Sequence, residues 1–409
     1  MNLLKEEALW FIKNFSGQLK TEDTAIICQS WNQLDKYLEH LKEAFSFYSA
    51  IHAIAIKTNP HPEVLRYIVS KGFGLEAASM EEVEMAIEAG ISTEKLVFDS
   101  PVKTRAEIKK CNEKYAGIKL NVNSLEELNR IPDNPNFSLG LRINPMVDAG
   151  SPDLYHVSSD ESKFGEPISN VQAIISACQQ FPITQLHIHS GSALGNLEVA
   201  TAAIAAVVEL ANRINVQLEL ASKDYRIKSI DIGGGLKPEK LGADLSQMKQ
   251  YANLLVKNVP DLVNFELVTE FGQWCHFYCG FAFSTVEYVM FRGKKQLAFV
   301  HLGADYFMRD AYVKPRGIEF CCLDKEGKVN DGEKRTTDIA GPLCFAGDYL
   351  VKDIPLSSLS EGDILLMLGT GSNTYGLWSR HCSRTIPKVV GVDFEKLTFT
   401  LLSERIKLY

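Results

Sequence analysis

The sequence AIAIKTNP, residues 53 to 60, places Lys57 directly after an apolar run, and this stretch decides the fold. From residue 49 to residue 56 a single histidine interrupts the run, as expected for a strand that is buried on both faces. Residues 63 to 69 then have the spacing of an amphipathic helix that stops at Gly72. The unit is a strand, a loop and a helix, with the lysine at the carboxyl end of the strand. In parallel α/β proteins this end carries the chemistry, because helices cover the faces of the sheet.

A lone lysine in this position is more often a surface residue whose aliphatic stem packs while its charge reaches water. The residues that follow in the chain favour a functional role instead. Seven further apolar stretches of strand length come after Lys57, and stretches with helical spacing separate them. The predicted strands are residues 74–78, 96–98, 117–122, 139–143, 185–189, 227–232 and 266–270.

This alternation predicts a closed, TIM-type (β/α)8 barrel. An open doubly wound sheet is the alternative. The barrel is favoured because polar residues follow many different strands, as they do around the mouth of a barrel.

From residue 274 onward the pattern changes to short strands with turn residues between them. It predicts a C-terminal all-β domain of the β-sandwich or β-barrel kind over residues 274–409. The barrel then occupies residues 31–273. A short strand at residues 24–28 lies in the N-terminal segment, residues 1–30, and is expected to join the β domain.

The composition indicates a globular protein that acts on small molecules. The net charge is -8 and no block of lysine and arginine stands out, so we expect no nucleic-acid partner. Residues 1–19 mix charged and apolar side chains and resemble neither a signal peptide nor a membrane span, which predicts a cytoplasmic protein without a membrane partner. Nine scattered cysteines fit reduced thiols better than disulfides, and we expect no metal site.

Several predicted strands end in residues that can bind a charged cofactor. Gly233, Gly234 and Gly235 follow the strand at 227–232 and would let a phosphate approach the backbone closely, although a plain turn is the alternative. His189 ends another strand, on the same face as a second histidine. Glu270 ends a third.

Together with Lys57, these residues suggest pyridoxal 5'-phosphate. The lysine would form a Schiff base with the cofactor. A carboxylate beside the pyridine nitrogen would keep that nitrogen protonated, which makes the ring an electron sink.

With these motifs in this order, the sequence resembles the fold-type III pyridoxal-phosphate-dependent decarboxylases, which include the diaminopimelate, ornithine and arginine decarboxylases. The resemblance covers nearly the whole chain. It implies an alanine-racemase-like barrel and the α-decarboxylation of an amino acid.

The resemblance also implies roles for individual residues of the barrel. Lys57 matches the lysine that holds the cofactor, and His189 matches the histidine that stacks on its ring. Glu76 stands where the family usually has an aspartate near that lysine. Arg142 matches an arginine near the cofactor hydroxyl, and Glu270 matches the partner of the pyridine nitrogen. The matches to cofactor-phosphate and adjacent positions are Ser192, Gly233, Gly234, Gly235, Gly272 and Gln273.

Further matches lie in the β domain. In the family, the cysteine that Cys344 matches enters the active site of the partner subunit and protonates the substrate carbon, which implies a homodimer with shared active sites. Tyr375 matches a tyrosine that lies by the phosphate. Arg309 matches an arginine that binds the substrate carboxylate in diaminopimelate decarboxylases. Tyr312 is one position away from the family's usual tyrosine.

Two departures from the family pattern bear on the substrate. Gln273 replaces an arginine, which removes a bidentate contact to an anion. Phe345 replaces an acidic residue that binds the distal ammonium group of the substrate, a charge-assisted hydrogen bond of roughly 1.5–3 kcal/mol. These changes suggest a diamino acid with an acylated or citrate-linked distal amine, of the kind used in siderophore synthesis.

Other functions stay open at this point. One is the diaminopimelate decarboxylase of lysine biosynthesis. A second is an amino-acid racemase, which Glu270 disfavours because racemases of this fold pair the pyridine nitrogen with an arginine. A third is an inactive relative that binds the cofactor.

Overall fold

The computed structural model describes residues 3–148, 158–159, 161–191, 194–313 and 315–408. These residues form two compact units. We call Leu38–Glu239 with Asp244–Trp274 the barrel unit, and Met1–Tyr37 with Lys240–Ala243 and Cys275–Tyr409 the sheet unit. The domain limits predicted from the sequence, at 30/31 and 273/274, stay a prediction.

The barrel unit is a closed barrel of eight parallel strands. Each strand pairs with the next one around the barrel, and the last strand pairs with the first. The strands are β2 (Ala50–Ala55), β3 (Gly74–Ala77), β4 (Leu96–Phe98), β5 (Lys119–Val122), β6 (Ser138–Asn144), β8 (Ile183–Ile188), β9 (Ser229–Asp231) and β10 (Glu266–Thr269). A short strand, β7 (Glu166–Pro167), pairs with the end of β6. The predicted barrel is confirmed, and the open sheet is excluded because β10 pairs with β2.

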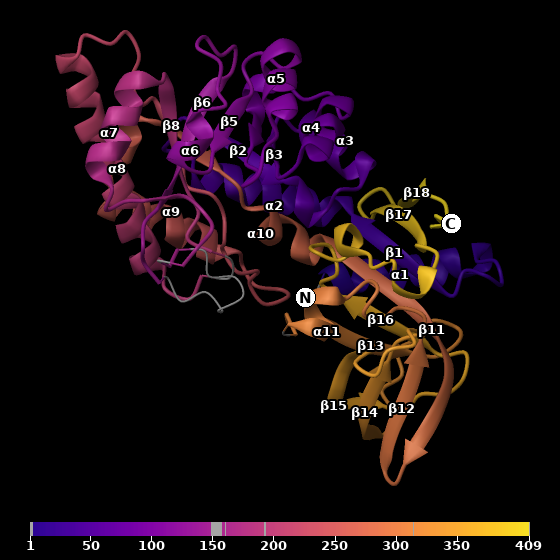
Figure 1. Cartoon of the computed structure of the whole chain (residues 1–409). Helices are drawn as coiled ribbons and strands as arrows, with labels where there is room; N and C mark the ends of the chain where they lie inside the picture. The colour runs from indigo at the N-terminus through magenta and orange to yellow at the C-terminus, as the bar shows by residue number, and fades with distance from the viewer. Residues whose placement is uncertain (1–2, 149–157, 160, 192–193, 314, 409) are drawn as a thin grey trace. The chain divides into compact units, whose positions relative to one another are not determined.

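Helices surround the strands of this unit (Figure 1). They are α3 (Pro62–Ser70), α4 (Met80–Glu88), α5 (Arg105–Lys114), α6 (Leu125–Leu128), α7 (Val171–Gln180), α8 (Leu197–Leu220) and α9 (Ser246–Asn258). An earlier helix, α2 (Trp31–Ala44), begins in the sheet unit and ends in the barrel unit.

Local sequence explains where these helices begin. The side chain of Ser79 accepts a hydrogen bond from the backbone N–H of Glu82 at the start of α4. Thr104 and Glu107 form a reciprocal capping box at the start of α5. Such caps satisfy N–H groups that have no partner within the helix, and they place each helix directly after its strand.

Helix α8 has the length and the apolar composition of a membrane span. Its buried side chains include Ala200, Ile204, Val207, Ala211 and Ile214, which recur at intervals of three or four residues. The helix packs against α7, α9 and β8. This pattern is typical of a helix that covers the core of a barrel.

The sheet unit contains one mixed sheet of nine strands. The strands are β1 (Ala25–Ser30), β11 (Gly280–Arg292), β12 (Lys295–Val300), β13 (Glu319–Leu323), β14 (Lys334–Ala340), β15 (Tyr349–Ser357), β16 (Ile364–Leu368), β17 (Lys388–Asp393) and β18 (Thr398–Ser403). The pairs β1–β17 and β12–β14 are parallel, and the other pairs are antiparallel. Strand β1 pairs with both β11 and β17, so a strand that precedes the barrel in sequence lies within this sheet.

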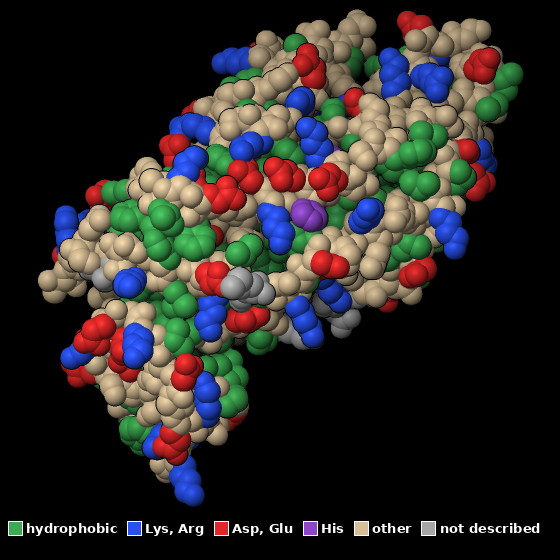
Figure 2. Space-filling view, turned by 180° about the vertical axis from the view of Figure 1, so that it is seen from behind, with side chains coloured by type: hydrophobic (Ala, Val, Ile, Leu, Met, Phe, Trp, Pro, Cys, Tyr) green, Lys and Arg blue, Asp and Glu red, His purple; other side chains and the backbone are tan. Residues whose placement is uncertain are grey.

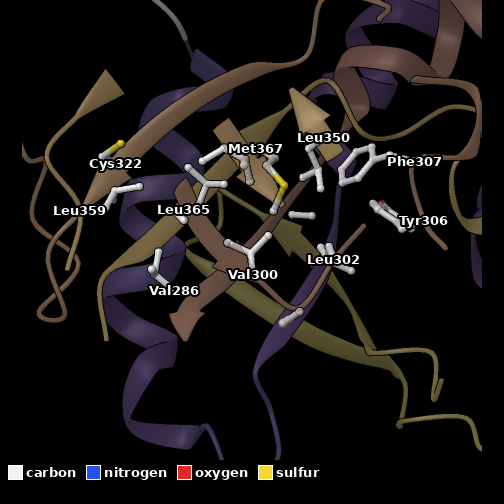
Figure 3. Packing of buried hydrophobic residues seen from close by; sticks show 14 of the residues in the cluster. Val286, Val300, Leu302, Tyr306, Phe307, Cys322, Leu350, Leu359, Leu365 and Met367 are labelled. Atoms are coloured by element: carbon white, nitrogen blue, oxygen red, sulfur yellow. The ribbon is translucent and has the colours of Figure 1, made fainter. Parts of the chain in front are cut away.

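The core of the sheet unit consists of aliphatic and aromatic side chains from several strands (Figure 3). Val286, Val300, Leu365 and Met367 point toward one another there, and each is no more than 3% exposed. Burial of each such side chain stabilises the fold by roughly 1.5–3 kcal/mol. Two helices of the unit are α1 (Leu3–Phe15) and α11 (Met308–Tyr312), and α10 (Gly272–His276) runs from the barrel unit into it.

On the molecular face seen in Figure 2, basic and acidic side chains are interspersed. The expected absence of a nucleic-acid partner stays a prediction.

One buried carboxyl group makes the stability of the sheet unit depend on pH. Glu7 of α1 is 1% exposed and accepts a hydrogen bond from Ser30 Oγ at 2.7 Å. Burial raises the pKa of Glu7 to about 8, above its ordinary value of 4.5. The folded protein therefore keeps a proton that the unfolded chain loses as the pH rises from 4.5 to 8, and stability falls over that range.

We predict that Glu7→Gln removes this loss. Urea unfolding at pH 8.5 should show the variant more stable than the parent protein by about 2–4 kcal/mol, and the difference should vanish near pH 4. Glu6→Gln on the same helix is the control and should leave the pH dependence unchanged. Equal pH profiles for Glu7→Gln and the parent protein would contradict the assignment.

Candidate active site

A cavity of about 240 Å³ lies at the carboxyl ends of the barrel strands. Its lining consists of Lys57, Ala78, Asp99, Pro101, Arg142, Phe164, His189 and Glu270. The structure thus brings together Lys57, Arg142, His189 and Glu270, which the sequence singled out, and adds Asp99, which sequence reasoning missed.

Lys57 projects from a single 3-10 turn, Ile56–Thr58, that directly follows β2. The hydroxyl of Thr58 donates a hydrogen bond to the carbonyl of Ala55 at 2.7 Å and fixes this turn. The amine of Lys57 lies 2.6 Å from Glu76 Oε2. The side chain of Lys57 is 50% exposed; the partial desolvation of its amine would lower the pKa, but the charges of Glu76 and Glu270 outweigh it and raise the pKa. Before any cofactor binds, the amine is therefore held as an ammonium ion.

Glu76 is the third residue of β3, and its side chain is fully buried. Burial raises the pKa of Glu76, the charge of Lys57 opposes that rise, and the charge of Asp99 adds to it. Among the described residues, no group hydrogen-bonds to Glu76 Oε1. The carboxyl group can therefore take a proton or accept a further hydrogen bond.

Asp99 follows β4 and holds two cationic or basic side chains in place. Its carboxylate lies 3.3 Å from Arg142 Nη1 and 3.2 Å from His187 Nδ1. Burial would raise the pKa of Asp99, but the charges of His187 and Arg142 lower it well below its usual range. The guanidinium of Arg142 also packs over the ring of Phe164 at 4.4 Å. Arg142 is thereby fixed at the wall of the cavity.

His189 and Glu270 both line the cavity and lie close together. The closest distance between His189 Nδ1 and Glu270 is 4.0 Å. The pKa of His189 is lowered well below its ordinary value by burial and by the charge of Arg142, so its ring is neutral. Its Nδ1 accepts a hydrogen bond from the backbone N–H of Gly234 at 3.2 Å, which places the ring proton on Nε2.

Glu270 is 6% exposed and has other carboxyl groups for neighbours. Burial and the charges of Asp231, Glu76 and Asp99 raise its pKa well above the ordinary value. Its Oε1 accepts no hydrogen bond from the residues that the structure describes. A carboxyl group in this setting favours a ligand that brings a positive N–H group.

The three glycines after β9 let the backbone pack closely at this end of the barrel. Gly233 has φ +64° and Gly235 has φ +99°, values that favour glycine. A Cβ atom on Gly234 would lie 2.4 Å from the carbonyl oxygen of Glu270. The N–H groups of Gly233 and Gly234 donate to Asp231 and His189, so these two donors orient protein side chains.

Gly272 and Gln273 open helix α10. A Cβ atom on Gly272 would lie 2.7 Å from Thr58 Oγ1, so this glycine permits α10 to begin beside the turn that carries Lys57. Gln273 is partly buried. Ser192 lies outside the described residues.

Five other predicted site residues lie in the sheet unit. Cys344 is an exposed free thiol, and Arg309 lies in α11. Tyr375 packs against the core of the sheet, where burial raises its pKa. The rings of Tyr312 and Phe345 stack with centroids 5.2 Å apart and an angle of 24° between their planes.

Sequence reasoning missed Asp99 and left the role of His187 open. Asp99 directly follows the predicted strand 96–98, so the rule that strand ends carry function could have found it. His187 is fully buried, whereas the side chain of His189 is 21% exposed. His187 therefore supports the site from inside the barrel.

The residues of the cavity fit pyridoxal phosphate. The unpartnered oxygen of Glu270 suits a protonated pyridine nitrogen, and the amine of Lys57 suits covalent attachment. Carboxylate and histidine ligand atoms in the same cluster also lie within 4.8 Å of one another, in the set His187, His189 and Glu270 and in the set Glu76, Asp99 and Glu270. The expected absence of a metal stays a prediction.

Comparison with known proteins agrees with this chemistry. Residues 31–275 match the family described as "Pyridoxal-dependent decarboxylase, pyridoxal binding domain". The chain is 25% identical to a diaminopimelate decarboxylase of Aquifex aeolicus over 394 residues, which cover 94% of this chain and 90% of the relative. It is 27% identical to a diaminopimelate decarboxylase of Neisseria meningitidis over 389 residues, which cover 90% of each chain.

The fold is similar to that of diaminopimelate decarboxylase from Helicobacter pylori complexed with L-lysine. The TM-score is 0.85 at 22% identity, over 97% of each chain. Because the family match spans more than half of this chain, it shows family membership as well as a shared fold. The chain therefore belongs to the pyridoxal-dependent decarboxylase family and is a pyridoxal-phosphate-dependent carboxy-lyase that acts on an amino acid.

Proposed function

We propose that this enzyme decarboxylates a diamino acid whose distal amine is acylated or citrate-linked. The observation that carries this proposal is the stacked pair Tyr312 and Phe345. The two rings are 53% and 39% exposed, and Phe345 directly follows Cys344. An aromatic pair offers a planar acyl group a flat apolar surface, but it offers an ammonium group no carboxylate.

The alternative substrate is meso-diaminopimelate, which the names of the relatives suggest. An ammonium group can bind the face of an aromatic ring, which contributes about 0.5–1 kcal/mol at an exposed site. A charge-assisted hydrogen bond to a carboxylate contributes roughly 1.5–3 kcal/mol. The aromatic pair is therefore the weaker site for a free ammonium group, and we favour the modified amine.

In the barrel unit we assign each cavity residue a role. Lys57 holds the cofactor, Glu76 takes and returns the lysine proton, and neutral His189 packs against the cofactor ring. Glu270 keeps a proton on the pyridine nitrogen. The bound cofactor would supply an electron sink for the electron pair that the departing carboxylate leaves.

Other residues of the barrel unit prepare the cavity. Asp99 keeps Arg142 in position for the cofactor hydroxyl. Ala78, Pro101 and Phe164 give the cavity an apolar wall, and a carboxylate placed there would lose hydration, which favours its departure. We assign the cofactor phosphate to the backbone near Gly235, with contributions from Ser192, Gly272 and Gln273.

In the sheet unit we assign Arg309 and Tyr312 to the substrate and Tyr375 to the cofactor phosphate. We infer that the protein is a homodimer in which Cys344 serves the active site of the other subunit as a proton donor. The exposure of this thiol supports the inference. We also infer a cytoplasmic location.

The first prediction for the active site concerns the proton on Lys57. Glu76→Gln removes the carboxylate 2.6 Å from the amine, so the pKa of Lys57 should fall. Stopped-flow absorbance measures the rate at which the cofactor attaches to the apoprotein. In the variant this rate should reach half of its maximum at a lower pH. At pH 8 attachment should be roughly tenfold faster for each unit by which the pKa of Lys57 falls. Glu63→Gln on the exposed side of α3 is the control. An unshifted midpoint would contradict the role of Glu76.

The second prediction concerns the substrate. Carbon dioxide release should show a higher kcat/KM for a citrate-conjugated diamino acid than for meso-diaminopimelate. Phe345→Asp should raise kcat/KM for meso-diaminopimelate by about tenfold, because it supplies the charge-assisted hydrogen bond. Phe345→Leu, which adds no charge, should not. A parent enzyme that prefers meso-diaminopimelate would overturn the proposed substrate and support the alternative.

The third prediction concerns the shared site. Lys57→Ala and Cys344→Ala should each abolish turnover alone. After the two variants are mixed and their subunits exchanged, about half of the dimers are mixed, each with one intact site, so about a quarter of parental activity should return. Failure to regain activity in a mixture shown by mass spectrometry to contain mixed dimers would rule out a contribution of Cys344 in trans.

A further inference from the structure

A second cavity, of about 470 Å³, lies at the amino ends of β2, β3 and β4. It is lined by Lys42, Phe45, Ser46, Tyr48, Ala50, Ile51, His52, Lys71, Gly72, Phe73, Gly74 and Lys95. It shares no lining residue with the active-site cavity, which lies at the carboxyl ends of the strands. Strand β2 connects the two places, because it begins in the second cavity and ends directly before the turn that carries Lys57.

The charged residues of this lining are all lysines. Lys42, Lys71 and Lys95 contribute three positive charges, in a chain whose net charge is -8. Lys95 Nζ donates a hydrogen bond to the carbonyl of Gly72 at 2.8 Å, which fixes one of these charges at the rim. A cavity of this sign attracts an anion.

Aromatic rings form another part of the lining. The ring of His52 lies between those of Phe45 and Phe73, with centroid distances of 5.7 Å and 6.0 Å. His52 Nδ1 is 2.9 Å from the hydroxyl of Thr269. Burial and the charge of Lys42 lower the pKa of His52 to about 4, so this ring is neutral at physiological pH and acts as a planar surface. The cavity therefore suits a flat ring as well as an anion.

A buried polar group in the lining lacks a partner. Tyr48 is 8% exposed, and no group among the described residues hydrogen-bonds to its hydroxyl. Buried hydroxyl groups in proteins are usually hydrogen-bonded. A ligand oxygen at this position would satisfy the hydroxyl.

We propose that the cavity formed by Lys42, Phe45, Tyr48, His52, Lys71 and Phe73 is a binding site for a small aromatic anion, a planar ring that carries a phosphate or carboxylate group. Its volume lies in the range of about 300–1,000 Å³ that small-molecule sites occupy. The lysines bind the anionic group, the ring of Phe73 packs against the ligand ring, and Tyr48 donates a hydrogen bond. The site is separate from the active site and does not depend on the identity of the substrate.

The test uses the full-length protein loaded with its cofactor, so that the active-site cavity is filled. Phenyl phosphate is the probe, and calorimetry measures its binding. Inorganic phosphate tests the anion without a ring, and benzyl alcohol tests the ring without an anion. Benzoate tests a carboxylate in place of the phosphate. We expect phenyl phosphate or benzoate to bind at least tenfold more tightly than inorganic phosphate or benzyl alcohol.

Variants locate the binding. Lys42→Glu combined with Lys71→Glu should weaken binding of the tighter probe at least tenfold, and Tyr48→Phe should weaken it severalfold. Lys249→Glu on α9, which reverses a charge elsewhere on the barrel unit, should leave binding unchanged. Absence of binding, or affinity that is equal in the lysine variant and the parent protein, would overturn the proposal.

A measurement on the unmodified protein avoids any question of misfolding. Acetic anhydride acetylates exposed lysines, and mass spectrometry quantifies each position. The tighter probe should protect Lys42 and Lys71 and should leave Lys249 as reactive as before. Equal acetylation of Lys42 and Lys71 with and without a saturating probe would contradict the site.

Discussion

The chemistry of the barrel unit depends on a constraint: its mouth buries more carboxyl groups than cations. Asp99 has two basic partners, Arg142 and His187, and its pKa is lowered. Glu76 has Lys57 as its partner. Glu270 is left with other carboxyl groups around it, and its pKa is raised. A cavity with this imbalance is stabilised by a ligand that brings positive charge, and a protonated pyridine nitrogen is such a charge.

The carboxyl groups of this imbalance come from different strands. Carboxyl groups repel one another, so they stay close only where the backbone fixes the distances between them. A barrel fixes these distances because its strand ends are spaced around a ring. Glu76 lies within β3, whereas Asp99 follows β4 and Glu270 follows β10. The hydrogen bonds of these strands hold the side chains rigidly. The site is therefore a property of the closed barrel and would be lost in an open sheet.

The barrel and much of its mouth could be predicted from the sequence because both follow local patterns. Apolar runs mark the strands, and polar residues such as Lys57 and Glu270 interrupt the pattern where strands end. Asp99 was missed although its strand, residues 96–98, was predicted, because an aspartate after a strand is as typical of a turn as of a functional site. The stacked rings of Tyr312 and Phe345 belong to residues 33 positions apart in the sequence. Helix and strand periodicity describes only local structure and cannot predict such a contact. The sheet unit was harder to predict from the sequence because its strand pairs also join distant residues; β1, for example, pairs with β17 near the other end of the chain.

The negative charge at the barrel mouth also restricts how the cofactor phosphate can be bound. An ionised carboxylate there would repel a phosphate, which agrees with our proposal that the cofactor phosphate binds the backbone near Gly235. Two N–H groups of that loop already donate to Asp231 and His189, which leaves fewer backbone donors for an anion. Gln273 supplies an uncharged amide where the related enzymes are expected to have a guanidinium. Under our proposal, phosphate binding in this chain therefore uses the remaining backbone N–H groups near Gly235 and neutral side-chain donors, because position 273 offers no guanidinium.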